Sequence, residues 1–73
     1  MEANQMLFGL IKEIESKLDD LKEMLKDIEK KAEQDNLRAF LSSVTLFKAK
    51  LHEIETTTYY LRYWYHKKLF KGD

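Results

Sequence analysis

Apolar residues recur in the first half of the chain with spacings that alternate between four and three positions. A stripe of this period is typical of an amphipathic helix in a coiled coil. The opposite side of the same segment carries mostly charged residues. The pattern predicts a helix over about residues 4–33, with Asn4 as its N-cap. The stripe consists of Leu7, Ile11, Ile14, Leu18, Leu21, Leu25, Ile28 and Ala32.

A second stripe fills the other half of the chain with the same period but a different phase. It predicts a helix over about residues 37–70. The step of five residues from Ala32 to Leu37 continues neither stripe. We therefore expect a loop at about residues 34–36, where Asp35 or Asn36 caps the second helix. The second stripe consists of Leu37, Phe40, Val44, Phe47, Leu51, Ile54, Thr58, Leu61 and Tyr65.

The two stripes match each other if the helices run antiparallel. The residue numbers of each facing pair then add up to 72. The centre of symmetry is therefore residue 36, which lies in the polar segment between the two stripes. The small Ala32 opposite the large Phe40 suits the narrow end beside a tight turn. We expect an all-α fold, an antiparallel two-helix hairpin that resembles a coiled coil. The predicted pairs are Leu7–Tyr65, Ile11–Leu61, Ile14–Thr58, Leu18–Ile54, Leu21–Leu51, Leu25–Phe47, Ile28–Val44 and Ala32–Phe40.

The segment "TTTYYLRYWY", residues 56–65, has the strongest β preference in the chain. We expect it to be helical, because the apolar stripe continues through it and a lone strand would have no partner. Its threonines are poor helix formers and favour a local weakness or bend. A single helix over the whole chain is the other alternative, and the change of phase argues against it. At the C-terminal end, Lys67, Lys68 and Lys71, followed by Gly72, fit a helix terminus and its cap.

The composition limits the possible classes of protein. With 73 residues, the chain forms one domain, residues 1–73. It has no Cys to form disulfides, and its two His make a structural zinc site unexpected. No apolar run is long enough to span a bilayer and the first residues do not resemble a signal peptide, so we expect a cytoplasmic protein. Residues 1–36 carry a net charge of −4 and residues 37–73 one of +4, which favours the halves lying side by side.

Apolar residues outside the two stripes gather at the open end of the predicted hairpin. A helix that is apolar on all sides must be covered, and here the cover must come from another molecule. A second copy, giving a four-helix bundle with two-fold symmetry, is the simplest candidate. A protein partner is the other, because Tyr, Trp and cations are typical of interface hot spots. The candidate partner-binding residues are Phe8, Leu10, Tyr59, Tyr60, Tyr63, Trp64, His66, Lys67 and Phe70.

These features favour a small non-enzymatic interaction module that binds through its aromatic and basic open end. Such a module would be an adaptor or inhibitor of a larger protein, for example a bacterial or phage accessory protein. The first alternative is a nucleic-acid-binding protein, in which aromatic rings stack on bases while Arg62, Lys67, Lys68 and Lys71 meet phosphates. The acidic first half and the neutral total charge argue against it. A purely structural homodimeric bundle is the second alternative, and contact with a membrane surface ranks lower. The sequence holds no nucleophile–base set, Gly-rich loop or metal-ligand spacing, so we expect no enzyme activity, cofactor or metal.

Overall fold

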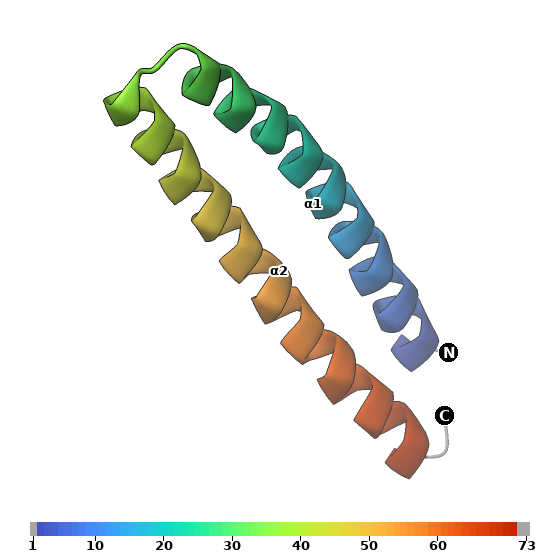
Figure 1. The fold of residues 1–73 in the computed structure, drawn as a ribbon. Coiled ribbons are helices and arrows are strands. Elements are labelled where there is room, and N and C mark those ends of the chain that lie inside the picture. Colours follow the sequence, from blue (N-terminus) through green and yellow to red (C-terminus); the bar gives the residue numbers. More distant parts are fainter. Residues whose placement is uncertain (1, 72–73) are drawn as a thin grey trace.

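Two helices make up the fold. The computed structural model describes residues 2–71, in which α1 covers Glu2–Glu33 and α2 covers Leu37–Lys71. The helices run antiparallel, and both ends of the chain lie at the same end of the rod (Figure 1). The Cα atoms span 55 × 15 × 11 Å. The predicted all-α antiparallel hairpin is confirmed.

Residues 34–36 reverse the chain through a helix cap in which Asp35 adopts a left-handed φ of 54°. The amide of Asn36 donates a hydrogen bond to the carbonyl of Lys31 at 3.4 Å, and the amide of Asp35 donates to that of Ala32 at 3.2 Å. These bonds form a Schellman motif, which satisfies carbonyl groups that the end of α1 would otherwise leave unpaired. Glycine usually occupies the left-handed position because a Cβ atom is unfavourable there.

Asn36, one of the two residues predicted for this role, is the N-cap of α2. Its Oδ1 accepts a hydrogen bond from the amide of Ala39 at 3.2 Å. Its carbonyl oxygen accepts the first helical bond, from the amide of Phe40 at 2.9 Å. The short loop thus ends one helix and begins the next with its own polar groups.

The predicted cap of α1 is wrong. This helix begins at Glu2, so that Asn4 lies inside its first turn. The physical reason is burial upstream of Asn4: Ala3 is only 3% exposed, and the helix continues far enough to place it against α2. The predicted C-cap at Gly72 lies outside the described residues.

α2 continues unbroken through residues 56–65, so the helical interpretation of this segment is confirmed. The hydroxyls of Thr56 and Thr58 each donate to the carbonyl four residues earlier, at 3.1 and 2.8 Å. These bonds satisfy the hydroxyls within the helix. Packing along the whole length of α1 outweighs the local β preference.

The predicted seam consists of two rows of residues on each helix, with a spacing of seven residues between successive members of a row. The structure places mainly the first row between the helices. This first row is buried or half-buried, as expected: Leu7, Ile14, Leu21 and Ile28 on α1, and Phe40, Phe47, Ile54 and Leu61 on α2. The assignment of the second row is wrong except at Val44, which is half-buried, because its other members are exposed: Ile11, Leu18, Leu25, Ala32, Leu37, Leu51, Thr58 and Tyr65. Residues on the other side of the first row replace them: Leu10, Lys17, Met24, Lys31, Ser43, Lys50, Thr57 and Trp64.

The helices are therefore rolled about their own axes relative to the prediction, with little shift along them. Polar contacts between the helices join Glu13 to Thr57, Lys17 to Glu53, Asp20 to Lys50 and Asp27 to Ser43. The residue numbers of each of these pairs total 70, close to the predicted 72. Each helix carries apolar residues in three adjacent rows, and a seam between two helices can bury only two of them.

Candidate interaction surfaces

One side of the seam is closed by polar side chains that we call the polar ladder. Thr57, which is 4% exposed, donates its hydroxyl to Oε2 of Glu13 at 2.8 Å. The Nζ of Lys17 lies 3.0 Å from Glu13 and 3.5 Å from Glu53 on the other helix. The full set is Glu13, Lys17, Asp20, Asp27, Lys31, Ser43, Lys50, Glu53 and Thr57.

The charges of the ladder stabilise one another. The hydrogen bond from Lys17, followed by the one from Thr57, lowers the pKa of Glu13, and the same contact with Glu13 raises the pKa of Lys17. The hydrogen bond from Lys31, followed by that from Ser43, lowers the pKa of Asp27. Opposite charges and donated hydrogen bonds favour the ionised form of each group. This side of the seam therefore has its polar groups matched within the chain.

The other side of the seam is open and apolar. We call it the apolar groove, and its exposed walls are Ile11, Leu18 and Leu25 on α1 and Leu37, Leu51 and Tyr65 on α2. Near the open end, Leu7 and Ile11 meet Leu61 and Tyr65 around a hollow of about 540 Å³. In the middle, Leu18 and Leu25 face Phe47. The groove therefore follows the seam over most of its length.

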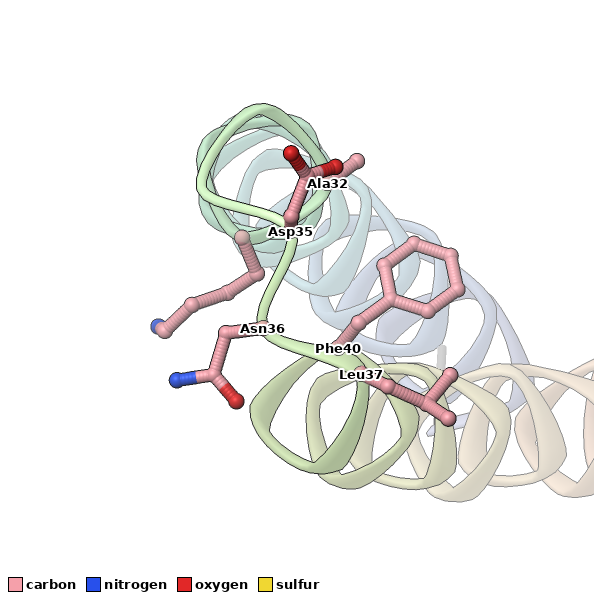
Figure 2. Close-up of a pocket in the computed structure, with 6 residues that line it drawn as sticks. Ala32, Asp35, Asn36, Leu37 and Phe40 are labelled. Atoms are coloured by element: carbon pink, nitrogen blue, oxygen red, sulfur yellow. The ribbon is translucent and has the colours of Figure 1, made fainter.

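The groove reaches the loop end of the hairpin. Figure 2 shows the side chains of Ala32, Leu37 and Phe40 on one side of the loop, with Asn36 pointing to the other side. Leu51 lies two heptads from both Leu37 and Tyr65, so it shares their side of α2. One apolar face thus extends from the open end to the loop.

The third surface is the aromatic end, which consists of residues 59–70 of α2. Lys67 Nζ lies 5.6 Å from the ring centre of Tyr63 and 5.7 Å from that of Trp64. These two rings are in edge contact at 5.7 Å. Such cation–π and edge contacts hold the side chains in a defined arrangement. Trp64 and Lys67 are half-buried, whereas Tyr63 is exposed.

Apart from Tyr65, which forms part of the groove wall, the remaining aromatic side chains of this end point outward. Tyr59 and Tyr60 are in edge contact at 5.7 Å, and His66 stacks on Phe70 at 5.6 Å. All four are exposed, and Phe70 reaches 82% exposure. The hairpin itself therefore makes little use of them.

The two candidate residues from α1 fall on different surfaces. Phe8 is 65% exposed and lines the open end of the apolar groove, together with His66. Leu10 is half-buried on the ladder side, in the row that contains Lys17. The structure thus separates Leu10 from Phe8 and divides the predicted partner-binding set.

The exposed walls of the groove were missed as a candidate site, because the sequence assigned them to the seam. A signal for the alternative was present in Leu10 and Met24, which extend the apolar stripe of α1 to a third row. An apolar face three rows wide exceeds what one partner helix covers.

Within residues 2–71, neither helix is long and apolar enough to cross a membrane. The same part of the chain holds no group of three or more His, Asp or Glu side chains arranged to bind a metal ion. The chain matches no protein-family profile, no curated protein and no solved structure. Its function is therefore argued from the three surfaces alone.

Proposed function

We propose that this protein is a non-enzymatic protein–protein interaction module, an adaptor or inhibitor of a larger protein, that binds its partner through the aromatic end. The observation that carries this proposal is the exposure of Tyr59, Tyr63 and Phe70 on α2. Their spacing of four and seven residues places them along one side of the helix. Exposed aromatic side chains bury large areas on binding at a low cost in conformational entropy.

The basic side chains around the rings set the chemistry of the partner. Lys67 is held over two aromatic rings, and Arg62 and Lys68 lie within the same two turns. A protein surface with apolar anchors and acidic side chains would match this arrangement. The opposite end of the hairpin, at the loop, has no comparable cluster of rings among the described residues.

Self-association into a four-helix bundle is the second part of the proposal. Among residues 3–70, the buried apolar side chains are Ala3, Leu7 and Leu21, a small core for a chain of this length. Such small helical chains need a partner or a second copy to bury enough apolar surface. The apolar groove supplies the surface for it.

The binding surface can be tested with variants that leave the hairpin intact. A Tyr59→Ser/Tyr63→Ser variant removes two exposed rings, and Leu41→Ser/Leu46→Ser removes two equally exposed apolar side chains near the loop. Partners are first captured from host extract with the unaltered chain, and each purified candidate is then titrated against all three proteins. We expect loss of binding for the tyrosine variant and unchanged binding for the leucine variant, with equal helicity by circular dichroism.

Equal binding by all three proteins would overturn the assignment to the aromatic end. Nucleic acid is tested in parallel, with a single-stranded oligonucleotide at low and moderate salt. Binding that weakens steeply with salt and depends on the two tyrosines would support the nucleic-acid alternative instead.

A further inference from the structure

The hairpin as a whole exposes more surface than a compact monomer of its mass, by about the area that each partner of a stable dimer buries. The chain exposes 5912 Å² for a mass of 8.8 kDa. A compact monomer of that mass exposes about 4,800 Å². The excess is about 1,100 Å² per chain, and a standard interface buries about 800 Å² on each partner. A second copy of the same shape is long enough to cover the apolar groove from the open end to the loop.

Two hairpins can stack groove to groove with two-fold symmetry in two orientations. In the parallel orientation both loops lie at one end, and α1 lies against α2 of the other copy. In the antiparallel orientation the loops lie at opposite ends, so that α1 lies against α1 and α2 against α2. The charged residues beside the groove distinguish these orientations, because like charges directly opposite each other are unfavourable.

On α1, the charged residues that border the groove are Glu15, Asp19 and Lys22. Glu15 and Lys22 flank Leu18 at distances of three and four residues, whereas Asp19 lies farther round the helix from Leu18. If two α1 helices cross antiparallel beside Leu18, Glu15 of each copy meets the partner's Lys22. The symmetry produces this favourable pair twice.

On α2, Lys48 and Glu55 flank Leu51 in the same way. An antiparallel crossing beside Leu51 brings Lys48 of each copy opposite the partner's Glu55, again twice. Four pairs of opposite charge would therefore border the antiparallel interface.

One symmetry axis serves both crossings. The midpoint between Glu15 and Lys22 falls between residues 18 and 19, and that between Lys48 and Glu55 falls between residues 51 and 52. Polar pairs between the helices have numbers that total 70, so these two midpoints lie at the same level of the hairpin. A single two-fold axis can pass through both.

The parallel orientation makes the same charges repel. There α1 faces the partner's α2, and the facing residues are those that lie at the same level within one hairpin. Their residue numbers therefore total 70. Glu15 then lies opposite the partner's Glu55, and Lys22 lies opposite the partner's Lys48. Both pairs are like charges.

We infer that the apolar groove binds a second copy of this chain in the antiparallel orientation, with the two-fold axis beside Leu18 and Leu51. This arrangement rests on the proposed self-association and specifies its face and its direction. The axis beside Leu51 places His66 opposite the partner's Leu37, so the residues beyond His66 extend past the partner's α2. Phe70 therefore stays free, and the dimer would present one aromatic end at each end of the rod.

The orientation can be measured with one spin label per chain. The sequence has no Cys, so Gln34→Cys in the exposed loop gives a single attachment site outside the groove. The antiparallel dimer places the two labels about 50 Å apart, since α1 has 32 residues at about 1.5 Å each. The parallel dimer places them roughly 10–20 Å apart, within the width of a four-helix bundle. Double electron–electron resonance separates these distances.

Each outcome has a distinct meaning. A dimer with the long distance supports the inference. A dimer with the short distance overturns it while leaving the proposed self-association in place. A chain that stays monomeric in sedimentation equilibrium up to hundreds of micromolar overturns both.

Charge reversal tests the same point without a label. In the antiparallel dimer, Glu15→Lys puts the new lysine opposite the partner's Lys22, and we expect dimerisation to weaken roughly tenfold over the two symmetric sites. The double variant Glu15→Lys/Lys22→Glu should restore it. Glu23→Lys is the matched control, since Glu23 lies on the ladder side beside Met24 and Leu46. Stronger dimerisation of Glu15→Lys would indicate the parallel orientation and overturn the inference.

Discussion

The polar ladder and the apolar groove are the two sides of one seam, and they differ in what completes them. On the ladder side, Thr57 and Lys17 connect α2 to Glu13 within the chain, so that each polar group has a partner. On the groove side, Leu18 and Tyr65 are 46% and 52% exposed, so the chain itself covers only about half of each. Hydrogen bonds and ion pairs require specific distances and angles, and only one rotational orientation of the helices satisfies them. Apolar contacts are less directional, so a second copy of the chain can make them equally well.

The largest effect is expected from a charge at the centre of the groove. Leu18→Glu places two carboxylates at the two-fold axis, where the interface would bury them without a partner. We expect the dimer dissociation constant to rise at least about 100-fold, equivalent to about 2.7 kcal/mol. Sedimentation equilibrium gives the mass, and circular dichroism checks that the hairpin remains helical.

Leu46→Glu is the control for this variant. Leu46 is 61% exposed, more than the 46% of Leu18, but it lies on the ladder side beside Ser43. If the two substitutions weakened dimerisation equally, the groove would not be the interface.

The difference between the two sides also shows how far the sequence predicts this fold. The hairpin, and a cap at Asp35 or Asn36, were predicted because the stripe, its change of phase and the cap residue are local signals. The rotation of the helices about their axes was not predicted. It depends on which of two neighbouring side chains, such as Lys17 and Leu18, is buried in the seam. The pattern favours burying the leucine, but the aliphatic part of a lysine can pack in a seam while its ammonium group reaches Glu53.

The candidate site was predictable to a similar degree. The concentration of rings in residues 59–70 is visible in the sequence, and the structure places Tyr59, Tyr63 and Phe70 on the surface. The groove was not predictable, because its walls have the same spacing as a buried seam. Only the roll of the helices decides whether Leu18 is a core residue or a surface residue.

A second prediction concerns a variant in which the ladder side of the seam is made more apolar, like the groove side. Lys17→Leu with Lys50→Leu replaces two ladder cations, whose side chains are 20% and 26% exposed, by apolar groups. The substitution leaves Glu13, Asp20 and Glu53 without their cations, so we expect no gain in the free energy of unfolding. Both sides of the seam would then carry exposed apolar groups, so we expect assemblies larger than a dimer in light scattering. The control Lys17→Gln/Lys50→Gln stays polar, and an equal mass for both variants would show that the ladder does not limit assembly.

A third prediction changes the stability of the hairpin without altering either side. Asp35→Gly relieves the left-handed backbone at φ 54°, and we expect the free energy of unfolding to rise by about 0.5–1 kcal/mol after the greater entropy of the unfolded glycine chain. Asp35→Ala keeps a Cβ atom there and should give no gain. Urea unfolding at neutral pH measures both. A gain from alanine equal to that from glycine would contradict the backbone explanation.

The smallest effect is expected from acid, and it concerns the ladder alone. Glu13 and Asp27 have pKa values lowered below their ordinary 4.5 and 3.8 by the lysine and hydroxyl donors around them. Because each pKa is lower in the folded state, the carboxylates stabilise the hairpin above their ordinary pKa values, and this contribution is lost as the pH falls through the lowered ones. The effect is small, since both groups face solvent and salt screens them.

A Glu13→Gln/Asp27→Asn variant isolates this contribution. Urea unfolding of both proteins at pH 7, 5 and 3 should show a smaller loss of stability for the variant between pH 5 and pH 3. Carboxylates beside the groove, such as Glu15 and Glu55, are the same in both proteins, so the difference reports the ladder. If the two proteins lost stability equally, the ladder carboxylates would not contribute to closing that side of the seam. The roll of the helices would then have to come from the packing of Thr57 and Trp64 alone.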